Sequence, residues 1–336
     1  MTARRLLALA SQSAASILPI RVARAERGAD GHWTVQWVLT GQDVRCLEVD
    51  PHNPEVIYAG TQGQGVFGSA DGGRNWRPMG LQGVIVKSLA ASPHQLGVVY
   101  AGTKSPPLIY RTADGGTHWE ELAGFRRVRG RWWWLSPAEP PFTAYVLALA
   151  ISPSDPDIVL AGVELGAVVR STDGGETWSN HRKGAGRDCH QLFFHPRQSQ
   201  WVYQAHGGGP SVSRDAGQTW TQPRQGLDRR YCINVAADLE RPERWYAVVA
   251  PMFKAHSADS QAIVVRSTGG GAWEKLGGGL PDMFDRLPLL ASDPITPGHL
   301  YLASGHGAVW HSTDSGDTWQ ELPINLGDVW FSLIVS

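Results

Sequence analysis

Four acidic residues stand where paired carboxyl groups could do chemistry: Glu164, Asp188, Asp282 and Asp285. Two carboxyl groups about 5–9.5 Å apart can hydrolyse a glycosidic bond, one as an acid and the other as a base or nucleophile. A structural explanation competes with this one, because aspartates recur at comparable places along the chain: Asp43, Asp188, Asp228, Asp285 and Asp328. Recurring aspartates commonly cap turns. A hydrolase and a turn-capping role are therefore both open.

Four histidines are the candidates for metal ligands: His190, His206, His256 and His306. Imidazoles that converge on one point can hold a transition metal. Their spacing matches no metal-binding motif, and His206 and His306 are offset by two residues within otherwise similar loops. We therefore expect ordinary surface histidines, with no metal and no cofactor.

Two stretches mix cationic and aromatic side chains. The first contains Arg127, Arg129, Arg131, Trp132, Trp133 and Trp134, and the second contains Phe253, Lys254 and His256. Interleaved arginine and tryptophan can stack on sugars, clamp anions or anchor a protein partner. Alternatively, the three tryptophans cover the channel mouth as a hydrophobic plug. With Arg230, Tyr231 and Arg286 and the histidines above, these residues form the predicted ligand- or partner-binding set.

Composition narrows the classes of function. Thirty lysines and arginines against 31 aspartates and glutamates give a net charge of −1 over 336 residues. This balance argues against nucleic-acid binding and against polybasic membrane association. No apolar run reaches the length of a membrane-spanning helix. The sequence also lacks a phosphate-cradling glycine loop, a nucleophile elbow and a Cys-x-x-Cys motif.

One motif recurs along the chain, and its elements must position all of these residues. The string Ser-Thr-Asp-Gly-Gly-Glu-Thr-Trp occupies residues 171–178, with close copies at 69–76, 112–119, 213–220 and 312–319. A degraded copy lies at 267–273 and a weaker one at 24–33. The final tryptophans are spaced by 43, 43, 59, 42, 53 and 46 residues, so two intervals contain insertions. The sequence therefore predicts a seven-fold array.

Each unit contains four short apolar runs separated by Gly, Pro, Asp and Asn, and four short strands per unit of about 45 residues are typical of a β-propeller blade. We predict an all-β, seven-bladed propeller of four-stranded antiparallel blades. The predicted blades are residues 1–41 with 328–336, 42–82, 83–125, 144–185, 186–227, 228–281 and 285–326, with an insertion at 125–143.

The repeated aspartates and tryptophans are predicted to be structural. Glycines supply the positive φ values of a tight hairpin, and an aspartate can accept hydrogen bonds from N–H groups of its own turn. The tryptophan fills the space beside that turn. The residues concerned are Asp71, Trp76, Asp114, Trp119, Asp173, Trp178, Asp215, Trp220, Trp273, Asp314 and Trp319.

The pattern Ser-x-Asp-x-Gly-x-x-Trp resembles the Asp-box, or BNR repeat. This repeat occurs in sialidases, sortilin-type receptors, xyloglucan-cleaving glycosidases and photosystem II stability/assembly-factor-like proteins. The resemblance implies a propeller fold but no single function, because this fold carries unrelated activities. The Arg-Ile-Pro signature of sialidases is absent, and residues 18–21 do not match it.

The two ends of the chain together predict one complete blade. Residues 328–336 resemble a first strand only, whereas Arg5–Ala10, Ile20–Ala25 and His32–Leu39 resemble the last three strands of a unit. A composite blade would close the ring and remove its unpaired edges. We expect a cytoplasmic monomer. The alternative is export through the signal-like segment that ends near Ala25.

Three cysteines, Cys46, Cys189 and Cys232, suit a reducing compartment, and a bridge between Cys189 and Cys232 is left open. In the expected ring, the loops opposite the Asp-box turns form the face that binds ligands. The preferred hypothesis is a non-catalytic propeller scaffold that binds a protein partner or a small ligand, such as a glycan, on this face. The alternative is a glycoside hydrolase that uses paired carboxylates at the channel mouth.

Overall fold

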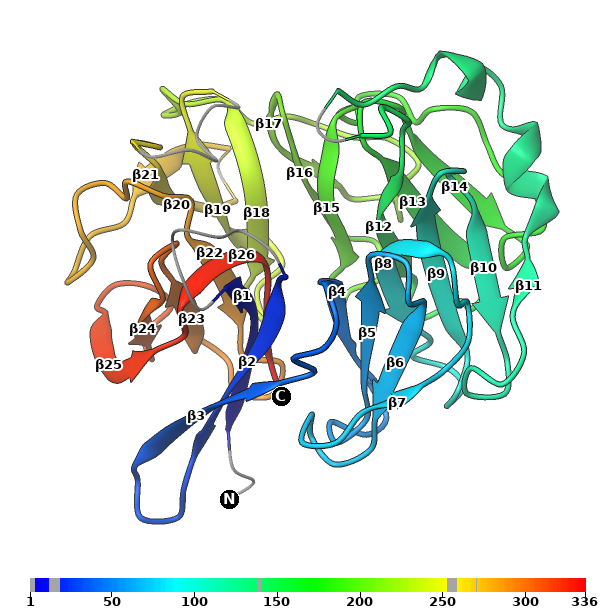
Figure 1. Cartoon of the computed structure of the whole chain (residues 1–336). Helices are drawn as coiled ribbons and strands as arrows, with labels where there is room; N and C mark the ends of the chain where they lie inside the picture. Colours follow the sequence, from blue (N-terminus) through cyan, green and yellow to red (C-terminus); the bar gives the residue numbers. More distant parts are fainter. Residues whose placement is uncertain (1–3, 12–18, 138–139, 253–258, 270) are drawn as a thin grey trace.

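Each repeat folds into one antiparallel sheet, because its short runs of Val, Ile, Leu and Tyr favour strands and its Gly- and Asp-rich turns return the chain. In this computed structural model, residues 4–11, 19–137, 140–252, 259–269 and 271–336 are described. Seven sheets among them stand around a common centre (Figure 1). The predicted seven-bladed, all-β propeller is confirmed.

The sheets are named here as blades, each given from its innermost strand outward. Blade 1 comprises β26 (Asp328–Val335), β1 (Arg5–Ser11), β2 (Arg21–Arg27) and β3 (Trp33–Val38). Blade 2 comprises β4 (Val44–Val49), β5 (Ile57–Thr61), β6 (Val66–Ser69) and β7 (Arg77–Pro78). Blade 3 comprises β8 (Ile85–Ala91), β9 (Val99–Lys104), β10 (Ile109–Thr112) and β11 (Glu120–Glu121), and is followed by two 3₁₀ helices, η1 (Ala123–Arg127) and η2 (Arg131–Trp133).

The remaining blades follow in chain order. Blade 4 comprises β12 (Val146–Ile151), β13 (Ile158–Val163) and β14 (Val168–Thr172). Blade 5 comprises β15 (Cys189–Phe194), β16 (Val202–His206) and β17 (Gly209–Ser213). Blade 6 comprises β18 (Tyr231–Ala237), β19 (Arg244–Ala250), β20 (Ile263–Thr268) and β21 (Trp273–Lys275). Blade 7 comprises β22 (Leu289–Ser292), β23 (Leu300–Ala303), β24 (Ala308–Ser312) and β25 (Gln320–Asn325).

The composite blade predicted from the two chain ends is present. Strand β1 pairs with β26 on one side and with β2 on the other, both antiparallel. Arg5 and Ser336 also exchange backbone hydrogen bonds, at 3.0 and 3.1 Å. This sheet gives the first and last segments of the chain a shared ladder, so neither presents an open edge toward the ring.

Blades 4 and 5 depart from the expected four strands, because each has only three regular strands among the described residues. In blade 4, the fourth segment still donates the Ser179 N–H to the Arg170 carbonyl and the Arg182 N–H to the Val168 carbonyl. Side chains take the place of its own carbonyls: Ser179 Oγ accepts the Arg170 N–H and His181 Nδ1 accepts the Val168 N–H. In blade 5 the fourth segment keeps a single bridge, Val212 to Thr221, and Pro223 follows it without an N–H to donate. The strand pattern is therefore shortened locally while the blade is retained.

The Asp-box turn is built by one repeated set of hydrogen bonds. In blade 4, Asp173 Oδ1 accepts the Ser171 hydroxyl at 2.7 Å and the Thr177 N–H at 2.9 Å. Trp178 donates its indole N–H to the Gly175 carbonyl at 2.8 Å. Equivalent indole bonds occur at Trp76, Trp220 and Trp319. The indole of Trp119 instead reaches the Met79 carbonyl of the preceding blade, and that of Trp273 reaches the Pro223 carbonyl.

Neighbouring blades are joined by hydrophobic cores and by histidines that follow the innermost strands. His52, His94 and His195 each place Nε2 within 2.8–3.1 Å of a carbonyl oxygen of the next blade, to which the imidazole donates. The cysteines Cys46, Cys189 and Cys232 are free thiols, so Cys189 and Cys232 are not bridged. In the described part of the chain, no helix has both the length and the apolar character needed to cross a membrane.

Candidate functional site

The inner strands of five blades share a β-bulge at the same place, near the start of the strand. The register shifts leave one residue of each strand outside the ladder: Arg45, Lys87, Leu147, His190 and Ile233. A bulge redirects the side chain of the extra residue. The residue type at this place differs from blade to blade, so it is a position where the ring can carry function without changing its fold.

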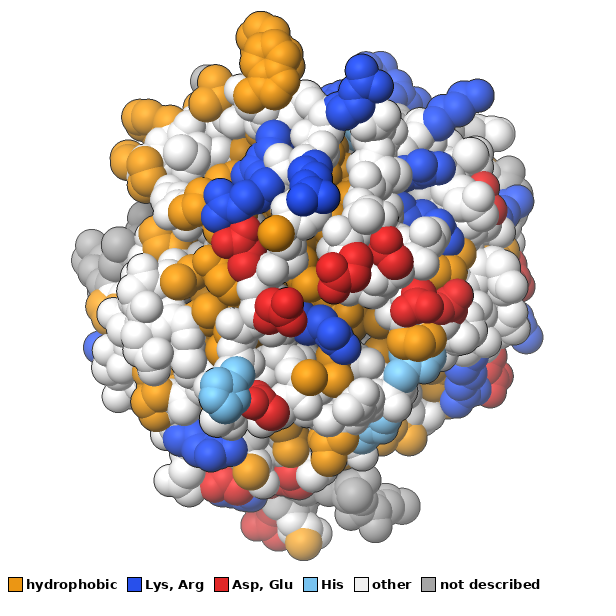
Figure 2. All heavy atoms as spheres, turned by 90° about the vertical axis from the view of Figure 1, so that its right-hand side faces the viewer, with side chains coloured by type: hydrophobic (Ala, Val, Ile, Leu, Met, Phe, Trp, Pro, Cys, Tyr) orange, Lys and Arg blue, Asp and Glu red, His pale blue; other side chains and the backbone are white. Residues whose placement is uncertain are grey.

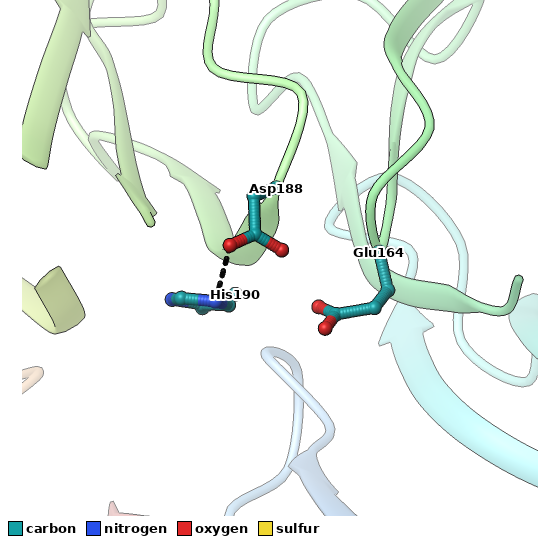
Figure 3. Close-up of side chains that lie close together, drawn as sticks. All are labelled: Glu164, Asp188 and His190. Atoms are coloured by element: carbon teal, nitrogen blue, oxygen red, sulfur yellow. Dashed lines mark ion pairs between the residues drawn. The ribbon is translucent and has the colours of Figure 1, made fainter. Parts of the chain in front are cut away.

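Glu164, Asp188 and His190 meet at this end of blades 4 and 5. Glu164 follows β13, Asp188 precedes β15, and His190 is the bulge residue of β15. Their side chains point toward one another (Figure 3), with one ligand atom of each lying within 4.8 Å of the others. Of the predicted carboxylate candidates, Glu164 and Asp188 are therefore brought together.

Backbone hydrogen bonds hold the segments that carry these residues. The Glu164 N–H donates to the Tyr145 carbonyl and the Gly166 N–H to the Arg187 carbonyl, both at 3.0 Å. The intervening Leu165 has a φ of 47°, a left-handed conformation that residues with a side chain seldom adopt. Such backbone strain persists where the surroundings enforce it, and it clusters at functional sites.

His190 is the most constrained member of the group. Its side chain is 4% exposed, and its ring packs on Tyr231 with 4.9 Å between centroids. Nδ1 lies 2.7 Å from the Cys232 carbonyl oxygen and must donate to it, whereas Nε2 lies 3.5 Å from Asp188 Oδ2. Burial disfavours the imidazolium, but the hydrogen bond with Asp188 and the charges of Glu164 and Asp188 outweigh burial and raise the pKa of His190.

Asp188 is held in its ionised form. Burial opposes ionisation, but the hydrogen bond with His190 and the positive charge of His190 outweigh it and lower the pKa of Asp188. His206 itself is kept neutral, because burial lowers its pKa to about 4. Its Nε2 contacts Ser211 Oγ at 2.8 Å and its Nδ1 accepts the Gly208 N–H, so His206 is not a free ligand.

The four-histidine metal cluster considered from sequence does not form among the described residues. His206 is occupied by blade 5, and His306 pairs with Asp285 at 2.9 Å instead of approaching His190. His256 lies outside the described residues, as do the predicted binding residues Phe253 and Lys254. The residue types that do converge are one histidine and two carboxylates.

The other two carboxylate candidates do not join Glu164 and Asp188. Asp282 is fully exposed and pairs with Lys275 at 3.2 Å, and Asp285 is committed to His306. Beside this pair, Arg286 bonds Asp328 at 3.1 Å and stacks over Trp330, 4.6 Å from its ring centroid. Arg286 is thus placed in a charged network of blades 7 and 1. Arg230 is exposed, and Tyr231 packs on His190 as described.

The insertion after blade 3 divides its three consecutive tryptophans between two roles. Trp134 is buried with Phe125 and Val128 in the core between blades 3 and 4, 5.8 Å from the Phe125 ring. Trp132 and Trp133 are 74% and 71% exposed and lie against each other with centroids 4.2 Å apart. Trp134 therefore belongs to the core between two blades, whereas Trp132 and Trp133 remain exposed to solvent.

The arginines of the insertion are divided in the same way. Arg126 pairs with Glu121, and Arg131 donates to the Pro107 carbonyl and lies over the Phe125 ring. Arg127 and Arg129 are exposed. Figure 2, which faces the side of the molecule on the right in Figure 1, shows hydrophobic side chains projecting from its upper edge beside a group of lysines and arginines. The surface here combines apolar and cationic groups.

Sequence reasoning missed several groups at this end of the ring. Lys87 lies over the Tyr145 ring, 5.1 Å from its centroid, and Trp330 stacks under Arg286. For Lys87 the signal was the bulge position, which it occupies in blade 3 as His190 does in blade 5. Aligning the starts of the inner strands would have exposed it.

Comparisons with known proteins agree with the fold. The BNR/Asp-box repeat profile matches residues 169–180. A probable oligoxyloglucan-reducing end-specific xyloglucanase from Neosartorya fischeri is 27% identical over 183 residues, which are 47% of this chain and 21% of that protein. This chain thus spans about a fifth of the length of that curated relative.

Two solved structures share the propeller architecture. An ancestral GH74 enzyme superposes with a TM-score of 0.64 and 17% identity, covering 88% of this chain and 38% of that one. YCF48 bound to a D1 peptide superposes with a TM-score of 0.57 and 19% identity, covering 84% and 83%. At these identities the likeness concerns the fold. With the repeat profile and the ring described above, the chain is a seven-bladed β-propeller built from BNR/Asp-box repeats.

Proposed function

We propose that this propeller is a non-catalytic binding module that holds an acidic, extended segment of a protein partner on its loop face. The loop face is the side opposite the Asp-box turns, and the insertion reaches it where Arg131 donates to the Pro107 carbonyl, between β9 and β10. The observation that carries the proposal is the exposed, mutually stacked pair Trp132 and Trp133 on an insertion anchored by Trp134.

Covering the two exposed indoles with a partner would contribute favourable free energy to binding. A tryptophan buries about 150–250 Å² when covered, which at about 25 cal/mol per Å² corresponds to roughly 4–6 kcal/mol before the costs of association. Exposed aromatic side chains that are already held in place are typical anchors of protein interfaces. Because Trp132 and Trp133 restrict each other, less side-chain entropy is lost on binding.

Charge indicates the kind of segment. Arg126 and Arg131 are engaged with Glu121 and the Pro107 carbonyl, whereas Arg127 and Arg129 extend into solvent next to the tryptophans. Guanidinium groups bind carboxylates in a bidentate manner. An acidic peptide with apolar side chains complements this combination. The fold likeness to YCF48, whose structure was solved with a peptide, supports a peptide as the ligand.

The proposal is tested by panning the full chain against a random peptide display library. We expect the enriched peptides to carry Asp or Glu beside aromatic or aliphatic residues. The double variant Trp132→Ala/Trp133→Ala should bind them at least about tenfold more weakly, a loss of about 1.4 kcal/mol or more. Arg127→Glu/Arg129→Glu should reverse the preference for acidic peptides.

The matched control is Leu96→Ala, because Leu96 is 60% exposed in the β8–β9 loop on the opposite face. This variant should bind the selected peptides as the wild type does. Equal binding by the double tryptophan variant, or failure of the wild type to enrich any peptide, would contradict the proposed function.

A glycoside hydrolase is the second candidate, and the specific observation for it is the proximity of Glu164 and Asp188. Two carboxylates this close suit a retaining mechanism. A general acid, however, needs a raised pKa, whereas the pKa of Asp188 is lowered. Turnover of chromogenic glycosides that is abolished by Glu164→Gln would establish this candidate, and absence of turnover across such a panel would remove it.

A further inference from the structure

The group formed by Glu164, Asp188 and His190 has no part in the proposed peptide contact, yet its geometry is specific. Three potential ligand atoms, one from each residue, lie within 4.8 Å of one another at the junction of blades 4 and 5 (Figure 3). We propose that these side chains bind a divalent first-row transition-metal ion, with His190 Nε2 and one oxygen of each carboxylate as ligands.

The hydrogen bond made by Nδ1 of His190 orients Nε2, the proposed ligand atom. Nδ1 carries a proton because its partner, the Cys232 carbonyl oxygen at 2.7 Å, can only accept. In the neutral ring the lone pair is therefore on Nε2, which faces Asp188 and Glu164. A carbonyl that fixes the tautomer in this way is the usual outer-shell arrangement of a metal-binding histidine.

The spacing suits one ion. Two atoms bound at about 2.1 Å to the same metal are separated by roughly 3.0–3.4 Å in octahedral or tetrahedral geometry. His190 Nε2 and Asp188 Oδ2 are 3.5 Å apart, close to this separation. Glu164 has a carboxylate oxygen within 4.8 Å of one ligand atom of each of the other two residues.

The carboxylates of this group are largely buried, and a bound cation would stabilise their charge. The His190 side chain is 4% exposed, Glu164 is 8% exposed, and Asp188 Oδ1 is buried without a hydrogen-bond partner among the described residues. Carboxylate oxygens out of water are costly unless they are paired or coordinate a metal. With a neutral imidazole the two carboxylates carry a charge of −2, which one divalent ion neutralises.

The donor set indicates the class of metal. One imidazole nitrogen with two carboxylate oxygens suits zinc, manganese or cobalt, whereas calcium and magnesium favour oxygen ligands alone. Three protein ligands leave at least one coordination position for water or for an anionic group of a ligand.

Binding of Co²⁺ and Zn²⁺ to the full chain tests the proposal, after dialysis against a chelator. We expect one saturable site per chain by calorimetry, a visible d–d absorption band with Co²⁺, and a Zn²⁺-dependent rise in melting temperature. His190→Ala, Asp188→Asn and Glu164→Gln should each weaken binding by at least about 10–100-fold, the loss that even an outer-shell partner causes.

His306→Ala is the matched control, because His306 also pairs with an aspartate but is 52% exposed. It should retain full binding. The melting temperature of each variant without metal shows whether that variant is folded. If His190→Ala does not fold, Asp188→Asn, which preserves the shape of the side chain, carries the test. Absence of saturable binding, or equal binding by the wild type and the folded ligand variants, would overturn the proposal and leave an imidazolium–carboxylate ion pair.

Discussion

The two faces of the ring differ in how far the same residue types repeat from blade to blade. On the Asp-box face the same residue types make the same bonds in blade after blade, as Asp71, Asp173, Asp215 and Asp314 do with the hydroxyl two residues earlier. On the loop face, corresponding positions hold different residues, such as Lys87 in blade 3 and His190 in blade 5. Residues that repeat from blade to blade have a structural role, and the residues that differ between blades are those to which we propose to assign binding.

Because of this contrast, side chains of one type, such as tryptophan, have different roles on the two faces. Trp220 is 6% exposed on the Asp-box face and bonds its own turn, whereas Trp132 is 74% exposed and bonds nothing in the turn that carries it. A residue that recurs in every blade is under the same packing constraint each time. A residue found once is free to meet a partner. The two faces should therefore respond differently to the same substitution.

The largest expected effect is the loss of a buried Asp-box tryptophan. Trp220→Ala should lower the free energy of unfolding by about 3–5 kcal/mol, because it leaves a cavity between blades 4 and 5. Trp132→Ala should change it by no more than about 0.5 kcal/mol. Urea denaturation of both variants measures the difference, and equal losses would break the distinction between the faces.

Removing an Asp-box carboxylate should have the next largest effect. Asp215 Oδ1 accepts the Ser213 hydroxyl and the Thr219 N–H, and its Oδ2 accepts the Thr219 hydroxyl. Asp215→Ala should therefore cost about 1–3 kcal/mol, whereas Asp282→Ala on the loop face, with one exposed ion pair, should cost less than about 0.5 kcal/mol. Denaturation at neutral pH distinguishes them. A larger loss at Asp282 would contradict the structural assignment.

The same carboxylates predict sensitivity to acid. Hydrogen bonds from the Asn75 backbone lower the pKa of Asp71 to about 2, and the pKa values of Asp114, Asp173, Asp215 and Asp314 are also lowered. A lowered pKa in the folded state means that the stabilisation is present above the unfolded pKa, about 4, and is lost as pH falls toward 2. Asp71→Asn should flatten this part of the stability curve. An unchanged curve would show that Asp71 does not contribute.

The smallest effect concerns the backbone of the Asp-box turn. Gly174 has a φ of +68°, and Ala216 occupies the equivalent place in blade 5 at +55°. Gly174→Ala should cost about 1 kcal/mol, although no atom lies within 3.4 Å of the added methyl group, and Ala216→Gly should gain about 0.5–1 kcal/mol. Melting temperatures should move in opposite directions. If the two melting temperatures moved in the same direction, backbone strain at this turn would not be the main cause of the effect.

The repeated part of the fold could be predicted because its sequence pattern occurs several times along the chain. The Asp-box turns, the seven blades and the composite blade all follow from comparing segments of this one sequence with one another. The shortened fourth strand of blade 4 was not predictable in this way, because the side chains of Ser179 and His181 accept the hydrogen bonds that strand carbonyls would otherwise accept, and this depends on three-dimensional placement.

The candidate site was predicted only residue by residue. Glu164, Asp188 and His190 were each singled out, but their convergence depends on the left-handed Leu165, which has no local sequence signal, and on the bulge in β15, which only an alignment of the inner strands would have revealed. The division of Trp132, Trp133 and Trp134 depends on η2, where three residues complete a turn and successive side chains point in different directions. Leu165 and η2 each belong to a single loop, so repetition could not reveal them.

A crystal structure of the chain with a selected acidic peptide tests the division of the two faces most directly. The account predicts that the peptide covers the indoles of Trp132 and Trp133 and that its carboxylates contact Arg127 or Arg129, with the Asp-box turns unchanged. A peptide bound across the Asp-box turns, with both indoles still exposed to solvent, would contradict it.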